Sequence, residues 1–140
     1  MKILYTAEGK AVGGRTGAAS TPDGALDLTL VKPKEMGGPG EGGTNPEQLF
    51  ACGYAACFVS TLGVIAQMEK TTIGTPEAVA KVSIGPNEDK PGYGLAVEMT
   101  VTIPDVDRDT AEKLLEKAHA MCPYSNATRG NIPVNITLTD

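Results

Sequence analysis

The stretch TNPEQLFACGYAACFVSTLGVIAQMEK, residues 44–70, decides the fold of this chain. It opens with Asn45 and Pro46, a helix cap followed by the residue favoured at the first helical position. Residues 49–66 then carry no charge. A helix that is apolar on every side lies either in a membrane or inside protein. Because strand-like sequence flanks it on both sides, we expect a buried central helix; membrane insertion is the alternative.

The segments around this helix have the patterns of strands and of one amphipathic helix. Residues 95–103 alternate between apolar and polar side chains, and residues 79–84 are the expected antiparallel partner. Asp109 is expected to cap a second helix that ends near Cys122, because Pro123 disfavours helical geometry in the residue before it. The other expected strands are a hairpin of residues 3–7 and 10–14, a strand at 26–30 and a closing strand at 132–138. This order of elements predicts an α+β fold.

Length and composition narrow the class of protein. A chain of 140 residues with 41% hydrophobic side chains is expected to form one domain over residues 1–140. Its 12 basic and 17 acidic residues give a net charge of −5, which disfavours nucleic acid as a partner. The first residues have no apolar run of a secretory signal, and the three cysteines are an odd number. We therefore expect a cytoplasmic protein with free thiols.

Three motifs that suggest chemistry are better explained by structure. Residues 36–43 contain a literal G-x-G-x-x-G, but no strand precedes it and Glu41 would repel phosphate, so a mobile loop is expected. Cys52 and Cys57 are five residues apart, about 140° around a helix, and cannot share one metal ion on one face. His119 is expected at the surface or in a last helical turn. No metal site is predicted.

Two thiols, one arginine and one glutamate are the strongest candidates for catalysis. By position alone, Cys57 is a small buried hydrophobe in mid-helix. Cys122 closes the second helix beside a proline turn, where a thiol can be exposed and mobile. Arg15 lies among glycines, and a guanidinium beside a thiol lowers the thiol pKa below its free value of about 8.5. Glu47 can hold that guanidinium in a bidentate pair; its alternative is a capping-box carboxylate with Thr44.

Several motifs, in order along nearly the whole chain, together resemble the organic hydroperoxide resistance branch of the OsmC-like thiol peroxidase family. They are GRTG at 14–17, PKEMGG at 33–38, TNPEQLFA at 44–51, GYAACF at 53–58 and CPYSNATRGN at 122–131. One departure is Cys52, where the family has a small residue without a thiol. Packing is the simplest role for it.

The resemblance implies a peroxidase that reduces organic hydroperoxides, alkyl or lipid, to alcohols. Cys57 would attack the peroxide and become a sulfenic acid, and Cys122 would then form a disulfide with it. Arg15 would stabilise the thiolate and Glu47 would orient Arg15. The reductant would be a dithiol, such as dihydrolipoyl groups on a lipoylated protein, so that no metal, haem or flavin is needed.

The same chemistry calls for an apolar cavity, and it raises a question of geometry. The residues expected to line the cavity are Met36, Leu49, Phe50, Phe58 and Met68.

Glu47 and Cys57 are ten residues apart, or about 15 Å along a straight helix. Either the helix bends near Gly53, or two chains build the site, and we expect an intertwined homodimer. The competing interpretations are a redox-sensing or apolar-ligand-binding domain without catalysis, and a structural domain with core cysteines.

Overall fold

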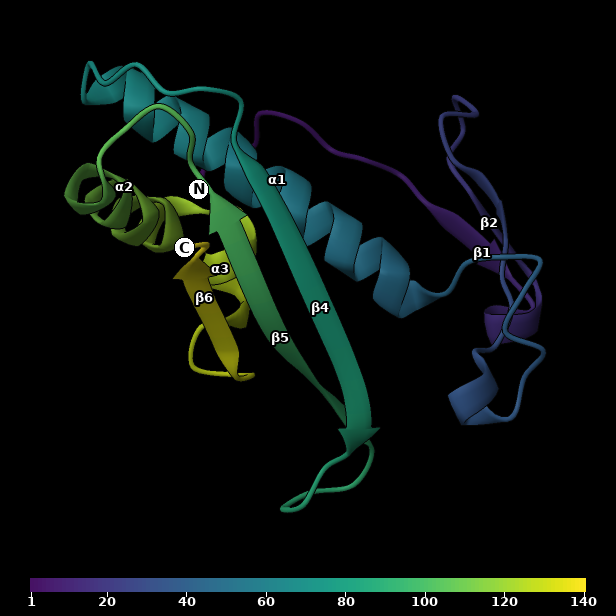
Figure 1. The fold of residues 1–140 in the computed structure, drawn as a ribbon. Coiled ribbons are helices and arrows are strands. Elements are labelled where there is room, and N and C mark those ends of the chain that lie inside the picture. Colours follow the sequence, from purple (N-terminus) through teal and green to yellow (C-terminus); the bar gives the residue numbers. More distant parts are fainter. The chain divides into compact units, whose positions relative to one another are not determined.

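A computed structural model describes residues 1–140. Its contacts divide the chain into two compact units, Met1–Leu49 and Phe50–Asp140, and each is described by itself. Figure 1 labels their helices and strands. The expectation of one domain over residues 1–140 stays a prediction. The α+β class is confirmed, because each unit contains a three-stranded sheet and three α-helices follow along the chain.

The first unit is a small antiparallel sheet with the order β1-β2-β3, made of Lys10–Val12, Ala18–Ser20 and Asp27–Thr29. A 3₁₀ turn, η1 (Gly14–Thr16), joins β1 to β2, and a second one, η2 (Lys34–Met36), lies in the glycine-rich segment. Gly17 closes the first turn, where a Cβ would stand 1.7 Å from the carbonyl oxygen of Val12. A glycine is therefore required there.

The expected hairpin of residues 3–7 and 10–14 is wrong. Residues 1–9 form no strand, and β1 pairs with β2 across the turn that carries Arg15. A strand pattern needs a neighbour to accept its ladder hydrogen bonds, and residues 3–7 find none in this chain. The expected strand at 26–30 is confirmed as β3.

The second unit is built on a sheet of order β4-β5-β6. β4 (Glu77–Pro86) and β5 (Tyr93–Thr102) are antiparallel, as predicted, and β6 (Val134–Leu138) adds in parallel to β5. The register places Val101, Met99 and Val97 of β5 beside apolar residues of both neighbours. One face of the sheet is therefore apolar and lies against the core.

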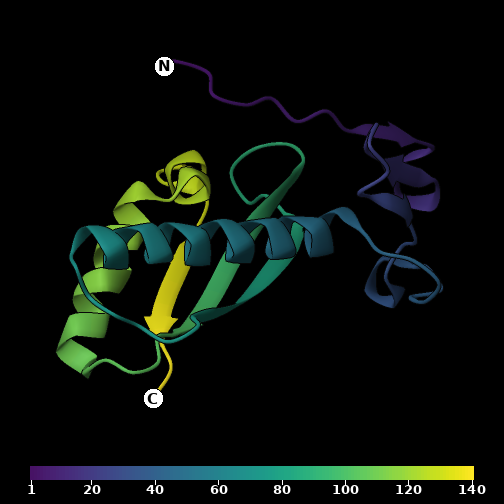
Figure 2. The ribbon, with the colours of Figure 1, turned by 90° about the horizontal axis from the view of Figure 1, so that it is seen from above.

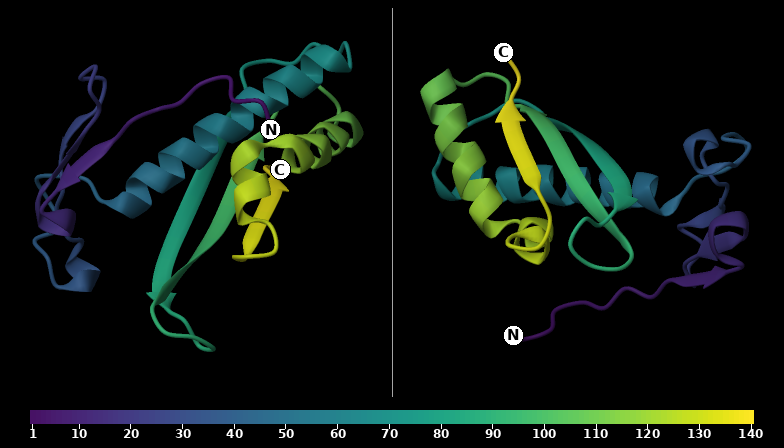
Figure 3. Two further views of the ribbon diagram at one scale, coloured as in Figure 1. Left: turned by 180° about the vertical axis from the view of Figure 1, so that it is seen from behind. Right: turned by 90° about the horizontal axis from the view of Figure 1, so that it is seen from below.

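Two long helices cover that face. α1 (Pro46–Met68) starts in the last residues of the first unit and crosses the strands, as Figure 2 shows. α2 (Arg108–Met121) packs beside β6, which both views in Figure 3 show. The largest fully buried side chains of α1 are Tyr54, Phe58 and Leu62. They meet the apolar face of α2 in one hydrophobic cluster.

The helix ends refine the sequence predictions. Asn45 caps α1, because its Oδ1 accepts a hydrogen bond from the backbone N–H of Gln48 at 2.8 Å. Asp107, and not the expected Asp109, caps α2: its carboxylate accepts from both the backbone N–H and the hydroxyl of Thr110. Aspartate is a favoured cap residue, so both Asp107 and Asp109 could begin the helix. Asp107 is the cap because Thr110 follows it by three residues and can donate to its carboxylate.

The expected burial of α1 is confirmed on one side of the helix. By length and composition α1 could also cross a membrane. Within this chain, 28% of its most apolar 18-residue stretch is buried. Exposed residues at every fourth position from Cys52 onward form a stripe without charge. We call it the α1 stripe: Cys52, Ala56, Ser60, Val64 and Met68.

Candidate active site

The two candidate thiols lie next to each other. The Sγ atoms of Cys57 and Cys122 are 3.8 Å apart, although 65 residues separate them along the chain. Cys57 comes from the middle of α1 and is half-buried. Cys122 stands between α2 and a third helix, α3 (Pro123–Thr128), which the sequence did not predict. Both thiols are free.

The expected exposure of Cys122 is wrong, because its side chain is 0% exposed. The proline after it ends α2, as predicted, but the chain turns at once into α3 and does not leave the core. The backbone N–H of Cys122 donates to Ala118, and its carbonyl accepts from Asn126. The thiol is therefore fixed between two helices.

The surroundings of Cys57 oppose its ionisation. Burial raises the pKa of this thiol above its ordinary value, and the hydrogen bond with Cys122 raises it further. A hydrogen bond from the backbone N–H of Tyr124 acts in the opposite direction. A thiolate at neutral pH therefore requires a cation beyond the groups that surround Cys57 here.

A bidentate ion pair joins Arg15 to Glu47 in the first unit. Nη1 of Arg15 donates to Oε2 of Glu47 at 2.8 Å, and Nη2 donates to Oε1 at 2.6 Å. The hydrogen bonds to Arg15 lower the pKa of the Glu47 carboxyl and raise that of the guanidinium. The capping-box alternative does not form, because the backbone N–H of Thr44 donates to Thr29 instead.

Backbone hydrogen bonds explain why these two side chains meet. Leu30 donates to the carbonyl of Gly17, and Val31 donates to that of Thr44. These bonds tie the end of the Arg15 turn to the segment that leads into α1. Arg15 then lies within reach of Glu47 in the first turn of the helix, whose side chain is 14% exposed.

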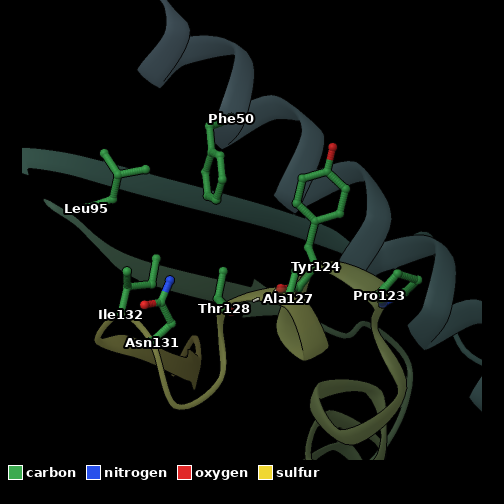
Figure 4. Close-up of a pocket in the computed structure, with 8 residues that line it drawn as sticks. All are labelled: Phe50, Leu95, Pro123, Tyr124, Ala127, Thr128, Asn131 and Ile132. Atoms are coloured by element: carbon green, nitrogen blue, oxygen red, sulfur yellow. Dashed lines mark hydrogen bonds between the residues drawn. The ribbon is translucent and has the colours of Figure 1, made fainter. Parts of the chain in front are cut away.

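An apolar pocket of about 420 Å³ opens in the second unit. Figure 4 shows the rings of Phe50 and Tyr124 pointing into it from α1 and α3, with Leu95 of β5 on another side. Tyr124 links the pocket to the thiols, since it lines the pocket and follows Cys122 by two residues. The remaining lining residues are Pro123, Ala127, Thr128, Asn131 and Ile132.

The other residues expected to line a pocket lie elsewhere. Phe58 is 0% exposed and belongs to the hydrophobic core, whereas Met68 is 64% exposed at the end of α1. Met36 and Leu49 are residues of the first unit, in η2 and in the first turns of α1. Cys52 is exposed on the α1 stripe and does not pack into the core, contrary to the simplest expectation.

Sequence reasoning missed a buried polar cluster beside the thiols. The hydroxyl of Tyr54 lies 2.8 Å from Oγ of Ser125, which lies 2.8 Å from Nδ1 of His119. The sequence did contain a signal for this cluster. Each of the three polar residues lies three positions before or after Cys57 or Cys122, which is within one helical turn. The prediction for His119 is confirmed in that it lies in the last turn of α2.

Comparison with known proteins identifies relatives over the full chain. A family model described as OsmC-like protein matches residues 38–137. An organic hydroperoxide resistance protein from Xanthomonas axonopodis pv. citri is 47% identical over 98% of this chain and 96% of its own length. The crystal structure of an organic hydroperoxide resistance protein from Elizabethkingia anophelis is 46% identical, with a TM-score of 0.94 over 100% of this chain and 99% of that one. A protein of the same description from Bacillus subtilis gives 42% identity and a TM-score of 0.90, covering 98% of this chain and 100% of its own.

Proposed function

Since this chain belongs to the organic hydroperoxide resistance branch of the OsmC-like family, we propose that it is a thiol peroxidase that reduces organic hydroperoxides to alcohols. The observation that carries the proposal is the 3.8 Å distance between the Sγ atoms of Cys57 and Cys122. Two free thiols within one small displacement of a disulfide, beside an apolar pocket, suit a peroxide with a hydrocarbon chain.

The reaction proceeds in two steps. The thiolate of Cys57 attacks one peroxide oxygen, the O–O bond breaks, and the alkoxide leaves as an alcohol after taking up a proton. Cys57 is then a sulfenic acid, oxidised by two electrons. The thiol of Cys122 attacks that sulfur, an S–S bond forms, and the hydroxyl leaves as water with the proton of the thiol. A disulfide bond is about 2.05 Å long, so the two sulfurs must approach from 3.8 Å.

Arg15 supplies the cation that Cys57 needs. Burial raises the pKa of this thiol, and a guanidinium close to it favours the thiolate. Glu47 holds the guanidinium by two parallel hydrogen bonds, which fix its plane as well as its position. The arginine is thus available as an oriented donor for the peroxide oxygens.

A second copy of the chain brings the ion pair and the thiols together. α1 is continuous through Gly53, so ten residues between Glu47 and Cys57 span about 15 Å. The α1 stripe offers an uncharged surface for this second copy, and an exposed apolar patch of this kind marks an interface. We therefore assign the protein as an intertwined homodimer, in which Arg15 and Glu47 of one protomer complete the thiol site of its partner. Sedimentation that finds a folded, active monomer would refute this arrangement.

The pocket favours substrates with an alkyl or aryl group. Phe50, Leu95 and Ile132 offer apolar surface, and the ring of Tyr124 lines the same pocket. Hydrogen peroxide has no group to bury there. The electrons return from a dithiol such as a dihydrolipoyl group, by thiol–disulfide exchange without a metal, haem or flavin, in the cytoplasm.

Intact-mass analysis tests the function directly. One equivalent of cumene hydroperoxide should remove two hydrogens from the reduced protein, and peptide mapping should link Cys57 to Cys122. Steady consumption of the hydroperoxide with dihydrolipoamide should follow. A redox sensor would oxidise once and stop, and a structural domain would leave Cys57 resistant to alkylation; either result would overturn the proposal.

A further inference from the structure

A chain of buried hydrogen bonds joins the three helices behind the thiol pair. Tyr54 of α1 and Ser125 of α3 are both 0% exposed, and their hydroxyl oxygens are 2.8 Å apart. Oγ of Ser125 also lies 2.8 Å from Nδ1 of His119 in α2. Thr128 is a side branch, 3.4 Å from the hydroxyl of Tyr54. No buried side-chain polar atom in the structure lacks a partner, so this cluster is fully satisfied.

The members of this hydrogen-bond chain lie close to both thiols in the sequence. Tyr54 precedes Cys57 by three residues on α1, so the two side chains lie on neighbouring turns of one face. His119 and Ser125 stand three residues before and three residues after Cys122. Their hydrogen bond therefore bridges the bend between α2 and α3 at which Cys122 lies. Arg129 strengthens the bridge, because its Nη2 donates to the carbonyl of His119 at 2.6 Å.

We propose that the Tyr54–Ser125–His119 hydrogen-bond chain is a positioning device for disulfide closure, holding Cys122 against Cys57. The side-chain hydrogen bonds of these three residues do not include either sulfur, so the three are positioning residues that act through the bend carrying Cys122. The inference rests on the proposed function for the identity of the reaction. Its physical basis is that a displacement of about 1 Å at a reacting group can cost about 100-fold in rate.

The protonation state of His119 sets the direction of the chain. Burial and the cation of Arg129 hold the pKa of His119 below its ordinary value. With its proton on Nε2, the neutral ring accepts at Nδ1 from Ser125, which accepts in turn from Tyr54. A protonated ring must donate to Ser125, so the chain reverses and ends on its longest link, from Tyr54 to Thr128 at 3.4 Å. Closure should therefore slow as His119 becomes charged.

The other charged groups around His119 do not reproduce this effect. α2 itself brings Glu112, Lys113 and Glu116 to the groove beside the ring, and β6 brings the neutral Asn135. Arg129, which follows α3, is the charged group that acts with burial to lower the pKa of His119. The side chain of α1 that meets this hydrogen-bond chain is the phenol of Tyr54. Glu112, Lys113 and Glu116 are all exposed, so solvent and salt screen their charges from the ring.

The test measures closure separately from peroxide reduction. Dimedone traps the Cys57 sulfenic acid in competition with closure to the disulfide. The ratio of trapped to closed protein in Ser125→Ala should show that closure is slowed by roughly 10- to 100-fold. Sulfenic acid formation should keep its rate. Val101→Ala destabilises the core without touching the chain and should leave the partition unchanged. Ser83→Ala, on the exposed side of β4, is the control for loss of a serine hydroxyl.

A conservative variant distinguishes positioning from simple packing. His119→Asn places an amide acceptor near the position of Nδ1 but cannot titrate. The ratio of the closure rate of His119→Asn to that of the wild type should not change with pH near neutrality. It should rise as the pH falls below the ordinary histidine pKa of about 6.5, because closure slows in the wild type there. A ratio that stays flat to pH 5, or a Ser125→Ala protein that closes at the wild-type rate, would overturn the inference.

A chemical oxidant separates this inference from the proposed function. Diamide adds to the Cys57 thiolate, and Cys122 then displaces the reduced hydrazine to leave the same disulfide. If the wild type reacts with diamide but not with a hydroperoxide, the proposed function fails while the positioning test remains decisive. If Ser125→Ala closes as fast as the wild type with both oxidants, the inference fails and the proposed function stands.

Discussion

Replacement of Gly53 by alanine should separate the stability of α1 from the shape of the pocket. A Cβ at this position would stand 2.8 Å from the hydroxyl oxygen of Tyr124 and 3.3 Å from its Cζ. Alanine in a helix interior is worth about 1 kcal/mol over glycine. A tyrosine ring forced from its rotamer costs of order 0.5–1.5 kcal/mol. The two effects nearly cancel, so the free energy of unfolding should change by less than about 1 kcal/mol.

The displaced ring of Tyr124 should instead lower kcat/KM for a substrate that fills the pocket. Tyr124 lines the pocket, and losing about 1 kcal/mol of contact with a bound group lowers kcat/KM by about fivefold. We expect that loss for cumene hydroperoxide, which fills the pocket, and little change for tert-butyl hydroperoxide. A coupled assay with dihydrolipoamide measures both substrates under the same conditions.

Two further variants make this prediction refutable. Gly63→Ala has no atom within 4 Å of the new Cβ and should show the full gain in helix stability. Tyr124→Phe removes the atom that stands nearest, so the double variant with Gly53→Ala should recover kcat/KM for cumene hydroperoxide. If the double variant is as impaired as Gly53→Ala alone, the steric argument is wrong.

The remaining predictions concern the charged pair and the thiols. Arg15→Ala should raise the pKa of Cys57 and abolish turnover; an alkylation rate whose pH dependence does not move would exclude the role of the guanidinium. Cys122→Ser should complete one turnover and then stall as a sulfenic acid, and repeated cycling with dihydrolipoamide would contradict it. The Arg15–Glu47 ion pair lowers the folded-state pKa of the Glu47 carboxyl, so its stabilisation is present above the unfolded pKa and is lost as pH falls through the folded one. Glu47→Gln should therefore lose about 1 kcal/mol at pH 6 and be less sensitive to acid than the wild type in denaturant titrations.

The helices and strands of this chain were largely readable from local pattern. The alternation at residues 95–103 predicts β5, and the uncharged run at 49–66 predicts α1, because side-chain periodicity follows from backbone geometry. Residues 3–7 are a short run that was expected to form one strand of a hairpin, and they form no strand. A strand depends on a partner as well as on its own residues, so local pattern is not sufficient for it.

Residue types and spacing were also enough to select the thiols, Arg15 and Glu47 as the groups worth examining, and the run of motifs was enough to suggest the family. What the tertiary structure decided is which of these groups meet. The 3.8 Å approach of Cys57 to Cys122, the burial of Cys122 and the bridge from His119 to Ser125 all depend on α3 turning back into the core. Such contacts join residues far apart in sequence, and their geometry is set by the packing of whole helices on the sheet, which no local pattern specifies.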